Sequence, residues 1–206
     1  GSAFHDLYAA LHSFTQPALL PTFDPMLVRA GEVSVLLTVP TLHNGIRQGL
    51  LNLIRSAQRA LYLRTWYFLP DEEILQALQC RAESGVQVRV MLSHHTRVPV
   101  VDLANYLPTH RLVQSGVQVY RYTGQYMHAK LAWNNRCDIL LGSANLDPRS
   151  MSGNFEICLA LRNAPLAQKL EQAFSVDLST CFTQTPETYN RRSLPQKILS
   201  HTCNLA

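Results

Sequence analysis

The sequence SGVQV occupies residues 84–88 and recurs unchanged at residues 115–119. Each copy follows a segment with apolar residues at helical spacing and opens a valine-rich run typical of a strand. A glycine at the end of a helix takes the left-handed backbone conformation that terminates it. Helix, glycine and strand, repeated about thirty residues apart, are typical of βαβ units. The repeat therefore predicts parallel strands joined by helices that cross the sheet.

The segments before the first copy continue the same alternation of strand and helix. Strands are predicted at residues 33–39 and 61–68, where β-branched and aromatic residues gather and a proline follows. Helices are predicted at 46–57 and 71–84, from apolar residues at helical spacing. A further helix should join the two copies, and Pro108 should kink or split it because proline lacks the N–H group that an inner helical turn needs.

The sequence after the second copy predicts shorter strands that follow one another directly. Strands are expected at 126–133 and 137–143, joined by a tight turn at 134–136, and again at 154–161. A final core helix is expected over 164–182, where leucines and a phenylalanine recur on one face. Together these patterns predict one α/β domain with a mostly parallel mixed sheet flanked by helices.

The composition is that of a globular protein with one core. The chain has 206 residues, 47% of them hydrophobic and 16% charged, which excludes a disordered, collagen-like or coiled-coil protein. A net charge of +4 suits anionic partners such as phosphate groups or acidic lipid, and is far below that of a dedicated DNA-binding arm. The five cysteines are odd in number and never in C-x-x-C spacing, which argues against a zinc site and for a reducing compartment.

Two side chains suited to phosphoryl chemistry stand close together in the third region. His128 and Lys130 are two residues apart in a run with strand character, so both should leave the same face. An imidazole beside an ammonium group suits an anionic phosphoryl group, because one can attack or transfer a proton while the other holds negative charge.

Polar residues that can contact a phosphate follow at a strand end. The run GSAN at 142–145 combines a glycine, which permits a close backbone approach, with the Ser143 hydroxyl and the Asn145 amide as donors. Glu156 can accept a hydrogen bond from an imidazole and fix its tautomer. Each residue alone is an ordinary feature of a strand or turn, so the prediction rests on their combination and order.

The residues HAK at 128–130, GSANLDPRS at 142–150 and NFE at 154–156 resemble the signature of the phospholipase D superfamily, H-x-K-(x)4-D followed by G-S-x-N. With YFLPDEEILQAL at 67–78, they are similar to the C-terminal half of bacterial cardiolipin synthases. The resemblance covers residues 33–182 and implies a phospholipase D-like α/β/α sandwich with one H-x-K (HKD) motif.

One position departs from the signature. The aspartate of the motif would stand at residue 135, where this chain has Asn135, and Asp138 lies three residues too late to replace it. The resemblance implies that this aspartate supports the motif and does not perform the chemistry. An asparagine serves a turn nearly as well as an aspartate does. We therefore expect the geometry of the site to be kept, while the lost charge puts full activity in question.

The resemblance implies a mechanism without metal or cofactor. One histidine attacks the phosphodiester phosphorus and forms a phosphohistidine, and a second histidine protonates the leaving alcohol and later activates the acceptor. By the same resemblance His128 is the general acid and base, and Lys130, Ser143 and Asn145 hold phosphate oxygens. Glu156 then orients a catalytic histidine.

The resemblance also implies that two HKD motifs face each other, whereas this chain carries one. Either a preceding half supplies the second motif or two copies of the chain pair as a homodimer. Gly1 and Ser2 are interpreted as a cloning scar and residues 1–32 as a lead-in or linker, which favours a missing N-terminal half. The isolated chain is then expected to be inactive alone. Tyr67, at the end of a strand, is a candidate for lining the pocket, although an aromatic core position explains it more simply.

The C-terminal tail, residues 183–206, has the character of a membrane-surface element. Arg191, Arg192 and Lys197 lie among leucine and isoleucine residues, a combination that suits anionic lipid, although an ordinary frayed helix explains it equally well. With the resemblance, this predicts phosphatidylglycerol as the substrate. It also predicts a peripheral location at the bacterial inner membrane, on its reducing side.

The resemblance implies a phosphatidyl transferase that converts two phosphatidylglycerols into cardiolipin and glycerol. Three other functions compete with it. A phospholipase D would hydrolyse the same intermediate with water. A homodimeric nuclease of single-motif chains would bind nucleic acid in a strongly salt-dependent way, and the modest net charge counts against it. A non-catalytic domain that pairs with an active partner is favoured only by Asn135, whereas the retention of His128, Lys130, Asn145 and Glu156 argues against it.

Overall fold

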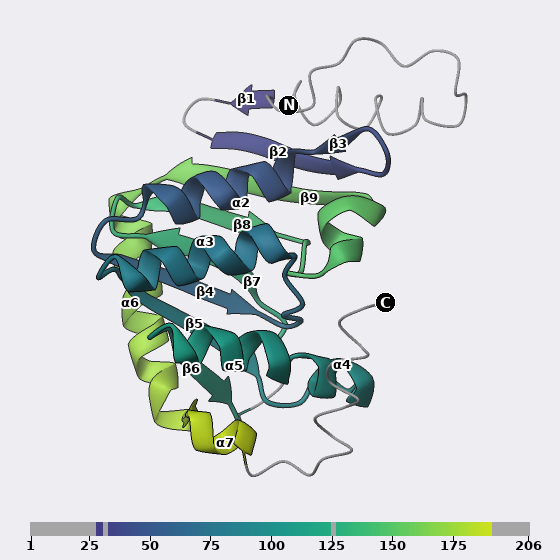
Figure 1. Cartoon of the computed structure of the whole chain (residues 1–206). Helices are drawn as coiled ribbons and strands as arrows, with labels where there is room; N and C mark the ends of the chain where they lie inside the picture. Colours follow the sequence, from purple (N-terminus) through teal and green to yellow (C-terminus); the bar gives the residue numbers. More distant parts are fainter. Residues whose placement is uncertain (1–27, 31–32, 125–126, 191–206) are drawn as a thin grey trace.

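The computed structural model describes residues 28–30, 33–124 and 127–190, which form an α/β fold built on one mixed sheet of ten strands (Figure 1). The strands are β1 (Val28–Ala30), β2 (Val33–Val39), β3 (His43–Asn44), β4 (Ala60–Thr65), β5 (Gln87–Ser93), β6 (Gln118–Tyr122), β7 (Lys130–Asn134), β8 (Asp138–Gly142), β9 (Glu156–Arg162) and β10 (Cys181–Gln184). Their order across the sheet is β1-β2-β9-β8-β7-β4-β5-β6-β10, and β3 pairs with β2.

Helices cover both faces of this sheet. They are α2 (Gly45–Ser56), α3 (Glu72–Glu83), α4 (Pro99–Ala104), α5 (Tyr106–Gln114), α6 (Ala164–Asp177) and α7 (Pro186–Asn190), with a π-helical turn η1 (Arg149–Gly153) and a 3-10 turn η2 (Leu178–Thr180). Figure 1 shows α2, α3 and α5 side by side on one face, and α6 behind the sheet. The prediction of a mixed sheet flanked by helices is thus confirmed. None of the helices in the described ranges is long and apolar enough to cross a bilayer.

The expectation of a mostly parallel sheet is corrected by the strand pairing. Only β4–β5 and β5–β6 are parallel pairs, and the other ladders are antiparallel. The crossover through α2 does join two strands of the same direction, β2 and β4, as the βαβ pattern requires. However, the three strands β7, β8 and β9 are inserted between them, so the two strands never pair. The sequence pattern shows which strands share a direction but not which strands are neighbours.

The repeated sequence forms the two βαβ units that it predicts. Gly85 and Gly116 have φ angles of 89° and 86°, in the left-handed region where a side chain would be strained. Each follows the end of a helix, α3 or α5, and stands two residues before a parallel strand begins. The predicted split of the helix before Gly116 also occurs, with Asn105 between α4 and α5. Pro108 explains it, since it offers no N–H group to the carbonyl of Ala104.

Two hydrophobic clusters lie on the two faces of the sheet. The larger one packs α2, α3 and α5 onto the sheet and includes Leu50, Ile54 and Leu78. The other packs α6 onto the opposite face, where Phe174 meets the edges of the stacked rings of Tyr62 and Trp133. These two clusters fix the strand ends that carry the polar residues described below.

The final helix is shorter than expected. It ends at Asp177 rather than at residue 182, and the chain continues through η2 into β10, which pairs antiparallel with β6. The buried Arg121 fastens this edge, because its Nε donates to Gln184 Oε1 at 2.9 Å and its guanidinium donates to Thr109 Oγ1 at 3.0 Å. The sheet therefore extends past the expected range 33–182, to Gln184 at one end and to β1 at the other.

Candidate active site

The polar residues singled out in the sequence meet at one edge of the sheet. Strands β4 and β8 end at this edge, and the antiparallel strands β7 and β9 begin there. Thr65 at the end of β4 pairs with Lys130 at the start of β7, and Gly142 at the end of β8 pairs with Cys158 in β9. Segments far apart in the sequence thereby bring His128, Lys130, Ser143, Asn145 and Glu156 to neighbouring positions.

His128 lies just before β7, which begins at Lys130 and not at residue 126 as expected. Both side chains nevertheless contact the same ring, that of Trp66. The His128 ring meets the Trp66 ring edge-on at a centroid distance of 4.5 Å, and Lys130 Nζ lies 5.2 Å from the Trp66 centroid. Lys130 Nζ also donates to the His128 carbonyl oxygen at 3.1 Å. The imidazole and the ammonium group therefore share one side of the chain.

Both groups have pKa values below their ordinary values. Burial lowers the pKa of His128, and the positive charge of Lys130 lowers it further. Burial also lowers the pKa of Lys130, against the opposing effect of the carboxylates of Glu156 and Asp147. These carboxylates are negative charges that act on Lys130.

Ser143 and Glu156 are joined by a hydrogen bond between their side chains. The Ser143 hydroxyl donates to Glu156 Oε2, and Ile157 N donates to Ser143 Oγ at 3.0 Å. Asn154 Nδ2 lies 3.5 Å from Glu156 Oε1, at the limit of a hydrogen bond. In this structure Ser143 thus orients Glu156. Its expected contact with a phosphate, and the expected contact of Glu156 with a catalytic histidine, stay predictions.

The side-chain oxygen of Asn145 is a buried polar atom. Its Oδ1 is buried and has no hydrogen-bond partner among the described residues. Asn145 and Glu156 line one cleft of about 910 Å³, together with Tyr67, whose ring stacks on Trp66 at 4.1 Å. A buried acceptor without a partner costs free energy, so such atoms commonly mark ligand-binding positions. Tyr67 lies in the cleft wall, and its contact with a substrate stays a prediction.

Two residues of this site were missed in the sequence. Trp66 contacts His128, Lys130 and Tyr67, and its signal in the sequence was the aromatic pair at a strand end. Asp147 is buried and accepts hydrogen bonds from Ser150 N at 3.0 Å and Ser150 Oγ at 3.4 Å. It thereby begins the η1 turn, which forms one wall of the cleft. The motif places Asp147 beside Asn145 in sequence, but only the fold turns it towards Lys130.

Asn135 lies at the opposite end of β7, about 17 Å along the strand from Lys130. Its Oδ1 accepts the backbone N–H groups of Gln58, Arg59 and Ala60 at 3.0, 2.9 and 3.3 Å. These bonds close the loop between α2 and β4. The position therefore needs an acceptor oxygen, which an amide provides as well as a carboxylate does.

Some expectations fall on other parts of the chain. Arg191, Arg192 and Lys197, the basic residues of the tail, lie outside the described residues, as does the lead-in up to residue 27. Within the described ranges, no group of three or more His, Cys, Asp or Glu side chains is arranged to hold a metal ion.

Comparison with known proteins gives one family match and many relatives. Residues 50–178 match the family described as cardiolipin synthase, PLD-like domain. The cardiolipin synthase of Clostridium perfringens is 33% identical over 153 residues, 74% of this chain and 32% of the relative. Cardiolipin synthase 1 of Staphylococcus epidermidis is 34% identical over 152 residues, 74% of this chain and 31% of the relative. The chain thus spans about a third of the length of these relatives.

Solved structures share the fold. Nuc from Salmonella typhimurium, a phospholipase D family member, matches with a TM-score of 0.64 and 18% identity, over 75% of this chain and 99% of its own. The phosphatidylserine synthase of Haemophilus influenzae matches with a TM-score of 0.64 and 20% identity, over 84% of this chain and 45% of its own. At these identities the likeness concerns the fold alone.

Proposed function

Because the chain belongs to the family of cardiolipin synthase PLD-like domains, we propose that it forms one half of the active site of a cardiolipin synthase-like phosphatidyl transferase. The observation that carries the proposal is the meeting of His128, Lys130, Asn145 and Glu156 at one sheet edge, beside a cleft that Asn145 and Glu156 line. The substrate would be an anionic phospholipid, phosphatidylglycerol, reached at a membrane surface.

In this reaction His128 acts as the general acid and base. A histidine of a second HKD motif attacks the phosphorus of one phosphatidylglycerol, and the phosphorus–oxygen bond to glycerol breaks. His128 gives its proton to the departing glycerol oxygen, and then takes one from the hydroxyl group of a second phosphatidylglycerol. That oxygen attacks the phosphohistidine, the phosphorus–nitrogen bond breaks, and cardiolipin forms. The lowered pKa of His128 suits the first transfer, because a protonated imidazole with a lower pKa gives up its proton more readily.

Lys130 and Asn145 hold the phosphate in this scheme. The ammonium group of Lys130 offsets the charge of the phosphate oxygens, and the Asn145 side-chain amide donates to them. Burial supports the role of Lys130, because a partly desolvated cation interacts more strongly with an anion than one in bulk water. Glu156, held by Ser143, would then accept a hydrogen bond from the histidine of the second motif.

The second motif would come from a preceding half or from another copy of the chain. Strand β9 carries exposed apolar residues beside the site, and such a partner could cover them. Ile157 and Leu159 are each 37% exposed, and they lie on one face of the strand immediately after Glu156. A partner that covers them would exclude water from the phosphohistidine, which favours transfer to lipid over hydrolysis.

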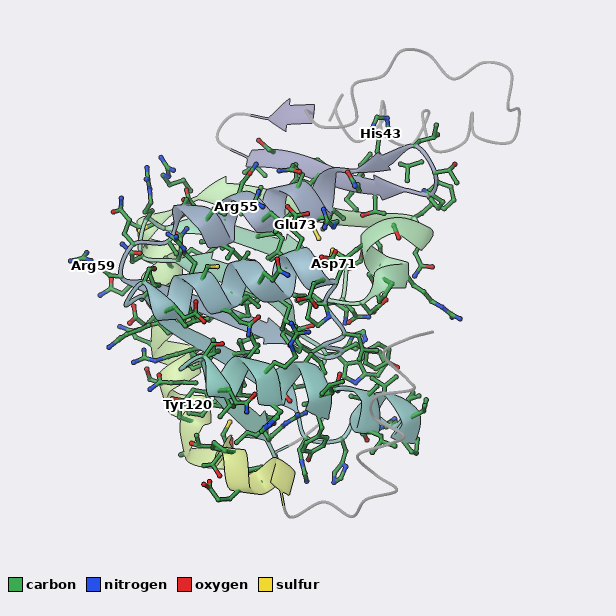
Figure 2. All side chains as sticks on the ribbon, in the orientation of Figure 1. His43, Arg55, Arg59, Asp71, Glu73 and Tyr120 are labelled. Carbon is green, nitrogen blue, oxygen red and sulfur yellow. The ribbon has the colours of Figure 1, made fainter. Side chains whose placement is uncertain are left out.

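The test is glycerol release and cardiolipin formation from phosphatidylglycerol vesicles by the full-length parent protein. We expect both products from the wild type and neither from His128→Ala. His43→Ala serves as the control, because His43 is an exposed histidine on the short strand β3 (Figure 2). Phosphatidic acid in place of cardiolipin would make the enzyme a phospholipase D. The absence of all three products from the wild type would contradict the proposal.

A further inference from the structure

The cleft that contains Asn145 and Glu156 continues beyond them, and its lining changes from polar to aliphatic. One end is polar and holds Asn145, Asn154, Glu156 and Arg149. The other end runs between the loop after β4 and the helices α4 and α5, where its lining is aliphatic. The aliphatic lining consists mainly of Leu69, Leu75, Val98, Val100, Val101 and Leu107.

We propose that this aliphatic end is a binding subsite for a hydrocarbon chain of the lipid whose phosphate lies at Asn145. The inference rests on the proposed function, which supplies the phosphate, and adds the part of the lipid that this chain itself recognises. It follows from the continuity of one cleft that passes from phosphate-binding groups to an apolar wall.

The solvent exposure of the aliphatic side chains in the cleft supports the proposal that they bind a ligand. Val100 is 53% exposed on α4, and Val98, Val101 and Leu107 are only partly buried, although they gather on one side of the cleft. Apolar side chains that face a cleft together lose contact with water when a hydrocarbon enters, and this is the main favourable contribution to such binding. A wholly polar substrate would leave these side chains hydrated.

The charged groups near the apolar end are already paired. The Arg111 guanidinium donates to both carboxylate oxygens of Glu72, at 2.8 and 2.6 Å. Asp71 accepts from the Arg47 guanidinium at 2.7 and 3.1 Å. A hydrocarbon that enters this end therefore meets charges that are already neutralised in pairs.

The experiment compares octyl phosphate with ethyl phosphate, which share a phosphate group and differ in hydrocarbon length. Binding to the purified chain is followed by chemical shift changes of backbone amides. We expect octyl phosphate to bind at least about tenfold more tightly, which the burial of two methylene groups already explains. Val100→Asn should reduce the ratio of the two affinities by about fivefold. Val176→Asn is the matched control, because Val176 is 72% exposed on α6, and it should leave the ratio unchanged.

The outcomes separate this subsite from the proposed function. Equal affinities for the two phosphates, or a ratio insensitive to Val100→Asn, would overturn the subsite. In that case, a shift of the Asn145 signal by ethyl phosphate would still support the phosphate site. If ethyl phosphate leaves the Asn145 signal unchanged, the phosphate site itself fails, and the subsite fails with it because it is defined by that phosphate.

Discussion

The Asn135 side chain accepts a hydrogen bond from the backbone N–H of Arg59 at 2.9 Å, and this bond ties the end of β7 to the loop before β4. The same oxygen accepts from two further N–H groups of that loop. The residue that departs from the family signature is therefore a structural acceptor, distant from the reacting groups. Its replacement of an aspartate changes the charge of the acceptor and keeps its hydrogen bonds.

Substitutions at Asn135 should affect stability according to whether they keep this oxygen. Asn135→Ala leaves three N–H groups without their acceptor, so we expect the free energy of unfolding to fall by about 1–3 kcal/mol. Asn135→Asp keeps the acceptor and should leave stability equal or slightly higher. Urea unfolding followed by circular dichroism measures both. A destabilisation by Asp as large as that by Ala would show that the oxygen is not what the loop needs.

The pKa of His128 should depend on Lys130. Burial and the neighbouring ammonium charge both lower the pKa of the imidazole, so its NMR titration should have a midpoint below 6.5. Lys130→Met removes the charge and should raise the midpoint, while the effect of burial remains. Lys169→Met, an exposed lysine on α6, is the control and should leave it unchanged. An unchanged midpoint in Lys130→Met would mean that the two groups do not interact.

The same shift has a consequence for stability. The folded chain binds the His128 proton less tightly than the unfolded chain does. The stability that His128 contributes to the folded state is therefore fully present above about pH 6.5. It is lost as the pH falls through the lower pKa that His128 has in the folded state.

Arg47 on α2 bridges two carboxylates at the start of α3, those of Asp71 and Glu73. Figure 2 labels both acidic residues. Burial would raise the pKa of Asp71, but the hydrogen bonds from Arg47 and from Ile74 N outweigh it and hold the pKa below its ordinary value. Arg47→Met should therefore lower the free energy of unfolding at pH 7 by about 1 kcal/mol.

The loss should shrink at acid pH. A carboxyl with a lowered pKa stabilises the folded state above its unfolded pKa, about 3.9, and loses this effect as the pH falls through the folded value. Urea unfolding at pH 7 and at about pH 3 measures the difference. Arg59→Met, at an exposed arginine, is the matched control. Equal losses at the two pH values would show that Arg47 acts through its packing and not through its charge.

Gly142 occupies a position with no room for a side chain. A Cβ atom there would meet the carbonyl oxygen of Ile157 and would lie 2.6 Å from Cys158 Cα. Since backbone cannot yield easily, Gly142→Ala should force β8 and β9 apart and cost about 1–3 kcal/mol. Because Ser143 follows directly, activity of the parent protein should fall as well. Gly153→Ala, where a Cβ meets nothing within 4 Å, should be tolerated in both measurements.

The sequence predicted those parts of the fold that depend on residues close together in the chain. Gly85 and Gly116 end helices because each needs a left-handed backbone, which is a local requirement. The insertion of β9 beside β2 was not foreseen, because it depends on pairing between Val33 and Leu161, far apart in the chain. Strand β10 was missed for the same reason, since pairing with β6 decides its conformation.

For the candidate site, the sequence identified the residue types but not their partners. The motif indicated Ser143 and Glu156 as independent contacts for phosphate and histidine. Those two contacts stay predictions. The fold also joins the two side chains to each other, because β8 and β9 are neighbours. Trp66 was overlooked, since a contact between its ring and His128 depends on the pairing of β4 with β7.

The position of β9 also determines when this chain can fold during synthesis. Strand β2 emerges from the ribosome before β4 to β8, and β9 follows only after these strands have been made. Until then β2 and β8 each present an edge that only β9 can satisfy. Pairing across so long a stretch of chain is slow, because the entropy of closing the loop is lost before the strand contacts are gained. The nascent chain therefore exposes the edge of β2 until β9 has been made, and this is a surface that a chaperone would protect.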